Sequence, residues 1–269
     1  MGKVEQTIKI RDIWCPDVDH IHLIPLFDIQ MGNKECDEEA LKAYVSYIAA
    51  EPNRRSCGGG DWVECHMLNN KALDLSEFTM PLKEAKMAVA KDVAPIIDKI
   101  DAAVGGNHEG RVTRASGDEP VFDILRFAGL SDEEAEERYD NDIMLVRYHV
   151  GKSGRTGRPI LYRGLIAHGW GGARSVGAHI NKVEEWFKVF PALDFAINGH
   201  EHDTSHSEPG YLDIPAQGKT VNRKKRLAIS SPSLCDWTRF ERGKAIRIPN
   251  IGAANIRLDG KRRDIHVNF

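Results

Sequence analysis

Five short polar clusters interrupt this chain, and their residue types are those that bind divalent metal ions. In chain order they are Asp28-Ile29-Gln30, Gly60-Asp61, Gly106-Asn107-His108-Glu109, His168-Gly169 and Gly199-His200-Glu201-His202. Two metal ions held about 3.5–4 Å apart need a bridging carboxylate, because only an anionic oxygen holds two cations so close. Histidine, carboxylate and amide oxygen suit Mn²⁺, Fe²⁺ or Zn²⁺, and no cysteine lies in the clusters. The clusters therefore predict a centre that holds two divalent metal ions.

Apolar runs directly before several clusters predict that strands deliver them. Residues 20–27 (HIHLIPLF) form such a run and end at Asp28, and residues 193–197 (LDFAI) lead to His200. Residues 102–104 (AAV) lead into the Gly106 cluster in the same way. Strands that are followed by a glycine or polar residue and then by a helix are typical of α/β sheets, which bind ligands beyond the carboxyl ends of their strands.

Helical and hairpin patterns complete the expected layout. Residues 37–50 and 81–100 have apolar residues at helical spacing, and Pro95 is predicted to break the second helix. Two β-rich runs, residues 143–150 and 159–167, predict a hairpin. Residues 151–158 between them would form its long basic tip. The antiparallel pattern in the second half implies mixed or stacked sheets, so the fold class is α/β.

Composition is ordinary for a globular enzyme of one domain, residues 1–269, with 41% apolar and 29% charged residues. No run of about 18 apolar residues occurs, so no membrane association is expected. The first twenty residues have no apolar signal segment, and the five cysteines form no CxxC pair. Reduced thiols and a cytoplasmic location are the expectation.

Charge is distributed unevenly along the chain. Residues 1–140 carry 16 Lys and Arg against 28 Asp and Glu, whereas residues 141–269 carry 21 against 12. A basic second half could serve an anionic partner such as nucleic acid, but acidic helices that neutralise basic loops within one domain explain the pattern as well.

The ordered set of clusters resembles the calcineurin-like metallophosphoesterase superfamily, whose motifs are DxH, GD, GNH[DE], H and GHxH. The resemblance covers residues 28–202, about two thirds of the chain. It implies a four-layer α/β/β/α sandwich, in which two mixed β-sheets are flanked by helices. The chain departs from the pattern at Gln30, where the family usually has histidine, so it is a DxQ variant. An amide oxygen is neutral and a poorer metal ligand than imidazole, so the first metal ion should be bound more weakly. A hydrogen bond from Gln30 to the Asp28 carboxylate or to a metal-bound water is an equally good interpretation of this residue.

The resemblance also implies a role for each matching residue. Asp61 would be the bridging carboxylate, and His108 would be the general acid that protonates the leaving group. The metal ions would activate a shared water as hydroxide for in-line attack on phosphorus. The implied metal ligands are Asp28, Gln30, Asp61, Asn107, His168, His200 and His202.

Two arginines are candidates for binding a substrate phosphate, because a guanidinium group matches phosphate oxygens. Arg111 follows the GNHE motif, and Arg174 lies in the glycine-rich segment after His168. A surface salt bridge is an equally good interpretation of Arg111. Manganese is the expected metal, with iron, zinc or nickel as alternatives.

The expected function is hydrolysis of a phosphomonoester or phosphodiester. A nuclease that uses the basic tip at 151–158 and a nucleotide or small-molecule phosphodiesterase both remain open. Gln30 slightly favours the second, because some manganese-dependent relatives that act on nucleoside diphosphate compounds carry glutamine there. The alternative from another class is a metal-binding scaffold on the same fold, like the retromer subunit. The sequence leaves the oligomeric state open.

Overall fold

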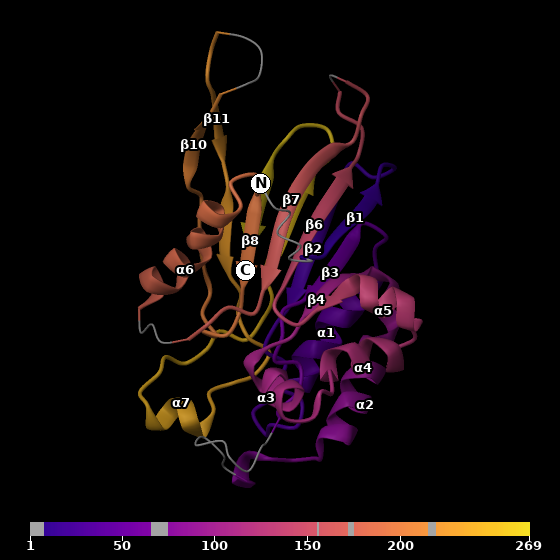
Figure 1. Cartoon of the computed structure of the whole chain (residues 1–269), viewed down its shortest axis with the longest axis vertical. Coiled ribbons are helices and arrows are strands. Elements are labelled where there is room, and N and C mark those ends of the chain that lie inside the picture. The colour runs from indigo at the N-terminus through magenta and orange to yellow at the C-terminus, as the bar shows by residue number, and fades with distance from the viewer. Residues whose placement is uncertain (1–7, 66–74, 155, 172–174, 215–218) are drawn as a thin grey trace, which may run out of the picture.

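The computed structural model describes residues 8–65, 75–154, 156–171, 175–214 and 219–269. Two six-stranded mixed sheets pack face to face, with helices over their outer faces (Figure 1). This is the four-layer α/β/β/α sandwich that the motifs predicted, and the fold class is confirmed.

The first sheet has the strand order β1-β6-β7-β8-β12-β9. Strands β7, β8 and β12 run parallel, so their carboxyl ends meet at one edge, whereas β6 and β7 form the predicted antiparallel hairpin. Its strands are β1 (Ile10–Cys15), β6 (Ile143–Val150), β7 (Ile160–Ala167), β8 (Phe195–Asn198), β9 (Ser205–Ser207) and β12 (Leu227–Ser230).

The second sheet has the strand order β14-β13-β2-β3-β4-β5, and strands β2 to β5 run parallel. Its strands are β2 (His20–Leu26), β3 (Arg54–Gly58), β4 (Ile100–Val104), β5 (Tyr139–Asp140), β13 (Asn255–Asp259) and β14 (Ile265–Asn268). A separate two-stranded hairpin projects from the sandwich and consists of β10 (Gly210–Asp213) and β11 (Asn222–Lys225) (Figure 1).

Helices cover both outer faces of the sandwich. The larger group packs on the second sheet and includes α1 (Glu38–Ala49), α2 (Leu82–Val93), α3 (Asn107–Ser116), α4 (Pro120–Phe127) and α5 (Asp132–Arg138). The first sheet is covered by α6 (Val176–Val189), and a short helix, α7 (Arg239–Gly243), lies below. As predicted, α2 stops before Pro95, and the 3₁₀ segment Ala94–Lys99 follows; a second 3₁₀ turn spans Leu75–Glu77.

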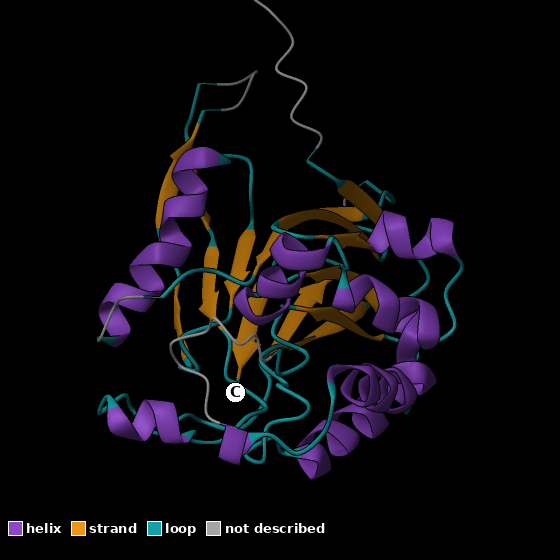
Figure 2. Cartoon of the chain, turned by 60° about the horizontal axis from the view of Figure 1, so that its bottom comes forward, coloured by secondary structure: helices purple, strands orange, loops and turns teal. Residues whose placement is uncertain are grey.

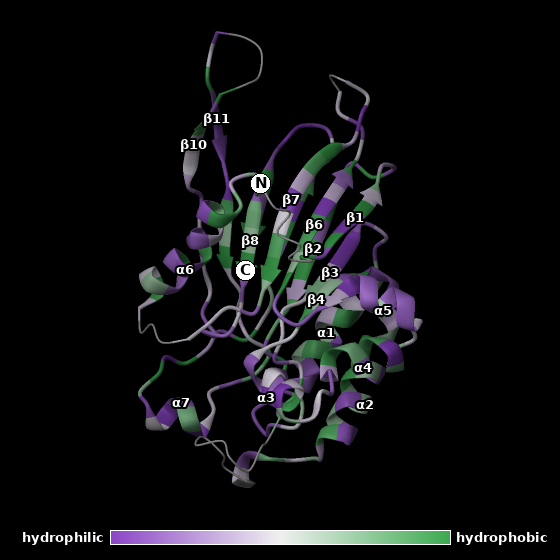
Figure 3. Cartoon of the chain, in the orientation of Figure 1, coloured by the Kyte–Doolittle hydropathy of each residue, from purple (hydrophilic) through white to green (hydrophobic). Residues whose placement is uncertain are grey.

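The core fills three interfaces between these layers. Apolar side chains of the two sheets interlock in the middle, including Phe27, Tyr148 and Phe195. A second group of apolar side chains packs between the second sheet and helices α1, α2 and α4. A third group packs between the first sheet and α6. The strands are accordingly the most apolar part of the ribbon, and the helices carry polar outer faces (Figure 3). Within the described residues, no helix is long and apolar enough to cross a membrane.

The basic hairpin tip lies at the wrong end of the sandwich to serve the metal clusters. It joins the end of β6 to the start of β7, and Lys152 at this tip pairs with Asp17. His168 follows the other end of β7, which has eight residues, so the tip lies roughly 25 Å away. A small substrate held at the metal clusters would therefore not reach this tip, and use of the tip by a nuclease, which needs an extended substrate, stays a prediction.

Candidate metal centre

The polar clusters converge at one end of the sandwich. Each of Asp28, Asp61, Asn107, His168 and His200 follows the carboxyl end of a strand, namely β2, β3, β4, β7 and β8 in turn. The loops after these strands gather on the side of α3 and α7 (Figures 1 and 2). Two sheets thus contribute ligand candidates to one place, as expected from the parallel strands.

Four of the expected ligands form one tight group. The ligand atoms of Asp61, His168 and His200 all lie within 4.8 Å of one another. His168 Nε2 is 3.2 Å from Asp61 Oδ2, 3.0 Å from His200 Nδ1 and 3.0 Å from Asn107 Oδ1. We call this group the second cluster. Its atoms all carry lone pairs that a divalent cation can accept, so the donor set fits a metal ion.

The other three expected ligands form the first cluster, beside it. His202 Nε2 lies 3.3 Å from Asp28 Oδ1 and 3.3 Å from the side-chain amide of Gln30. Asp28 Oδ1 is buried and accepts no hydrogen bond among the described residues. The second oxygen of Asp28 accepts the backbone N–H of His200 at 3.0 Å, which joins the two clusters. A buried carboxylate oxygen that faces a histidine nitrogen in this way also fits a cation in place of a proton.

The backbone is strained at the ligand candidates themselves. Six non-glycine residues of the described chain have positive φ, and five of them are candidate ligands: Asp28, Gln30, Asp61, His200 and His202, with φ between 48° and 70°. Left-handed backbone disfavours residues with a Cβ, and such strain persists where the surrounding structure enforces it, commonly at functional sites. The strain therefore marks this set of residues without reference to any motif.

Glycines let the two central loops approach each other. A Cβ on Gly60 would lie 2.7 Å from Gly106 Cα, and one on Gly106 would lie 2.1 Å from Asp61 Oδ1. Gly60 also has a φ of 85°. The buried carboxylate of Glu109 then accepts the N–H groups of Gly106, Asp61 and two further residues, Trp62 and Val63, at 2.7–3.1 Å. Glu109 thus holds the Asp61 loop in place, a role that its motif alone did not reveal.

His108 lies beside the second cluster but does not join it. Its Nδ1 is 2.7 Å from Glu64 Oε1, and its Nε2 is 3.8 Å from Asp61 Oδ2. The carboxylate of Glu64 therefore orients the ring, so that Nε2 faces the metal centre. Glu64 was not a sequence candidate; its spacing in Gly60-Asp61-Trp62-Val63-Glu64 is the only signal that could have indicated it.

Asn107 joins the second cluster to Arg111. One end of its side-chain amide lies 2.6 Å from His200 Nδ1, and the other end lies 3.1 Å from Arg111 Nη2. Arg111 therefore lies close to the candidate ligands, where a guanidinium group suits an anion. The other arginine candidate, Arg174, lies outside the described residues.

The pKa values show where protons reside in the metal-free protein. Burial works to lower the pKa of His168, but Asp61 outweighs it and raises this pKa to about 9. Burial likewise opposes protonation of His202, yet Asp28 and Glu241 raise its pKa well above the ordinary range. For His200, burial and the neighbouring His168 lower the pKa. A metal ion at either cluster must therefore compete with a proton.

Helix α6 holds the loops that carry the histidines. His179 is buried, and its two ring nitrogens lie 3.3 Å from Glu201 and 3.1 Å from Asp203, the residues that flank His202. Lys182 pairs with Glu201 and donates to the backbone oxygen of Trp170 at 2.6 Å. One helix face thus ties together the loops after β7 and β8.

Replacing His179 with alanine is expected to loosen the turn that carries His200 and His202. Two nearly buried carboxylates would lose a partner, so the free energy of unfolding should fall by about 1–3 kcal/mol. Metal affinity should fall about tenfold, as for other residues that orient ligands. Chemical denaturation and metal titration measure the two effects. The matched control is Asn181→Ala on the exposed side of the same helix; equal losses in both variants would contradict this role of His179.

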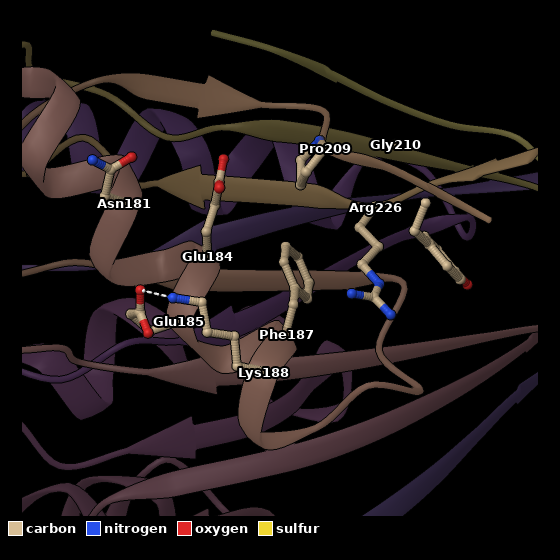
Figure 4. Close-up of a pocket in the computed structure, with 9 residues that line it drawn as sticks. Asn181, Glu184, Glu185, Phe187, Lys188, Pro209, Gly210 and Arg226 are labelled. Atoms are coloured by element: carbon tan, nitrogen blue, oxygen red, sulfur yellow. Dashed lines mark hydrogen bonds and ion pairs between the residues drawn. The ribbon is translucent and has the colours of Figure 1, made fainter. Parts of the chain in front are cut away.

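The cavity drawn in Figure 4 does not belong to the metal centre. It has a volume of about 420 Å³ and lies between the end of α6 and the start of β10. Arg226 packs over the rings of Phe187 and Tyr211, at 5.2 and 4.0 Å, and Lys188 pairs with Glu185. None of the candidate ligands is among the residues that line it.

Comparisons with known proteins give similarity in structure only. No protein-family model and no curated protein matches the chain. A predicted phosphoesterase from Streptococcus pneumoniae has a TM-score of 0.37 and 12% identity over 93% of this chain and 90% of that chain. For Vps29 from Entamoeba histolytica, solved with Zn²⁺, the TM-score is 0.39 with 8% identity over 92% and 97%. The calcineurin-like phosphoesterase YfkN from Bacillus subtilis has a TM-score of 0.34 with 11% identity over 93% and 90%. The solved structures to which this chain is similar thus include calcineurin-like phosphoesterases and Vps29.

Proposed function

We propose that residues 1–269 form a single calcineurin-like metallophosphoesterase domain, which hydrolyses phosphate esters with two divalent metal ions, most simply Mn²⁺. The observation that best supports the proposal is the left-handed backbone at five of the seven candidate ligands. Aspartate and histidine adopt this backbone more readily than most residues, but five such positions gathered at one place are typical of a functional site. The lone pairs that converge in each of the two clusters also support the proposal.

Each residue has a definite task in the proposed reaction. Asp28, Gln30 and His202 would hold one ion, Asn107, His168 and His200 the other, and Asp61 would bridge them. When bound, the ions would polarise the phosphoryl group and make a water molecule more acidic. His108, oriented by Glu64, would give its Nε2 proton to the leaving oxygen. Arg111, which lies 3.1 Å from the Asn107 amide, would bind a phosphoryl oxygen.

Within the enzyme class, a small phosphodiester or nucleotide is the favoured substrate. The basic hairpin tip lies roughly 25 Å from the clusters, as the length of β7 requires. The cluster Arg223–Arg226 precedes β12, whose far end lies beside Asn198 and the GHEH loop. Both basic segments thus lie away from the candidate ligands, which favours a small substrate over a long nucleic acid. A scaffold on the same fold is disfavoured because His108 and its Glu64 partner would then have no task.

Hydrolysis assays with added Mn²⁺ test the proposal directly. The full chain is expected to cleave bis-p-nitrophenyl phosphate or p-nitrophenyl phosphate, and protein treated with a chelator is expected to be inactive until metal is restored. A parallel series with nucleotides, single-stranded DNA and double-stranded DNA separates the substrate classes. A chain that binds two ions and cleaves none of these esters would favour the scaffold. Cleavage of DNA alone would favour the nuclease.

A further inference from the structure

Glu241, a residue that belongs to none of the motifs, contacts the imidazole ring of His202 on the side away from Asp28. Glu241 Oε1 lies 3.0 Å from His202 Nδ1. Its other oxygen accepts the N–H and the hydroxyl group of Thr238, at 2.7 and 2.8 Å, in the capping box of α7. Only 7% of Glu241 is exposed to solvent. One carboxylate therefore joins the start of α7 to a candidate ligand 39 positions earlier in the chain.

The segment that carries Glu241 is fixed to the loop of the first cluster. Ser233 Oγ donates to the backbone oxygen of Asp28 at 3.1 Å, and Leu234 N–H donates to the same oxygen at 3.2 Å. At the start of α7, the N–H of Arg239 donates to Glu77. The position of Glu241 relative to Asp28 and His202 is therefore set by the fold rather than by a free surface side chain.

The partner of each histidine decides which ring nitrogen remains for a metal ion. Glu241 lies beside His202 Nδ1, whereas Asp28 and Gln30 lie beside Nε2. A carboxylate beside Nδ1 can accept a proton from it, which would leave Nε2 available for a metal ion. In the second cluster the corresponding partner of His168 is the backbone oxygen of Gly59, at 2.9 Å. An anionic partner raises the basicity of the imidazole more than a neutral carbonyl does. The histidine with the anionic partner, His202, thus belongs to the first cluster, which also contains the weaker ligand, the amide of Gln30.

We propose that Glu241 is a positioning residue that fixes the tautomer and orientation of His202, and thereby offsets the weak ligand Gln30 in the first cluster. This inference rests on the proposed function, because it requires that His202 bind a metal ion. Glu241 touches neither substrate nor metal in this account; it acts through the histidine ring. The affinity of the first metal position should therefore depend on Glu241 although Glu241 does not contact the metal ion.

Titration of the full chain with Mn²⁺, followed by calorimetry and metal analysis, tests the proposal. Glu241→Gln is expected to weaken the first position by about 10–100-fold and to leave the second position unchanged. The matched control is Thr238→Ala, which removes the hydroxyl contact to Glu241 but keeps the backbone N–H contact and the pairing of Glu241 with His202; it should lower the melting temperature and change metal affinity much less than Glu241→Gln does. In Glu241→Gln, adding Gln30→His should restore part of the lost affinity.

The outcomes separate this inference from the proposed function. Wild-type protein that binds no metal would overturn both. Two ions in the wild type, with unchanged affinities or equal losses at both positions in Glu241→Gln, would overturn the role of Glu241 alone. If the variant does not fold, ¹⁵N NMR of the wild type with Zn²⁺ gives the answer: a proton on His202 Nδ1 supports the proposal, and a proton on Nε2 overturns it.

Discussion

Asp61→Asn is expected to abolish phosphoesterase activity and to weaken binding of both metal ions by about 100-fold or more. Residues that merely orient ligands change metal affinity by 10–100-fold, and Asp61 is the proposed bridge between the two ions. An amide cannot supply the negative charge that two neighbouring cations require. The variant keeps the size of the side chain and can still accept the N–H of His108, which lies 2.8 Å from Asp61 Oδ1. Metal analysis and activity assays on the folded variant measure the loss.

The same variant should also change how metal binding depends on pH. In the wild type, the pKa of His168 is raised to about 9 through Asp61, so a proton occupies this histidine at neutral pH and must leave when metal binds. Metal affinity should therefore rise with pH until that pKa is reached. Without the carboxylate the pKa of His168 falls, and the residual affinity should reach its plateau at lower pH. An unchanged affinity and pH profile in Asp61→Asn would contradict the bridging role.

Strand position was predictable where apolar runs end at polar residues. The run at 20–27 and the run before His200 correspond to β2 and β8, because buried strands need continuous apolar sequence. The strand before Asp61 has no such signature, because Gly58 and Gly59 are required there: a Cβ on either would collide with Trp62 or Phe27. The close packing around this loop requires glycine, and glycine weakens the sequence pattern that would predict a strand.

Supporting residues of the centre could not be found in the same way. Glu241 and His179 act across long stretches of sequence, and a single glutamate or histidine in a helix is no signal of its own. The left-handed backbone at Asp28 and Gln30 could not be predicted either, because the sequence signal for positive φ is usually a glycine. The candidate ligands could be named from the sequence because metal chemistry restricts residue type. The supporting contacts could not be named, because many residue types can make them.

His108→Asn is expected to lower kcat by about 10²–10⁴-fold while both metal ions remain bound. The loss follows from removing a general acid, since His108 lies near the clusters but is not among their converging ligand atoms. The effect should depend on the leaving group. A p-nitrophenyl ester releases a stable anion that needs little protonation, whereas an alkyl ester releases a basic one, so the alkyl ester should lose more activity. Equal losses on both esters would assign His108 to charge stabilisation rather than proton transfer.

Glu64→Gln tests whether the pKa of His108 sets the upper pH limit of activity. Burial works to lower the pKa of His108, but Asp61 and Glu64 outweigh it and raise this pKa above its ordinary value. His108 must be protonated to act as an acid, so activity should fall as the pH rises through its pKa. Removing the negative charge of Glu64 lowers that pKa, and the alkaline limb of the kcat profile should move to lower pH. The acidic limb, if set by metal binding, should stay in place; an alkaline limb that does not move would separate the ring orientation set by Glu64 from the acidity of His108.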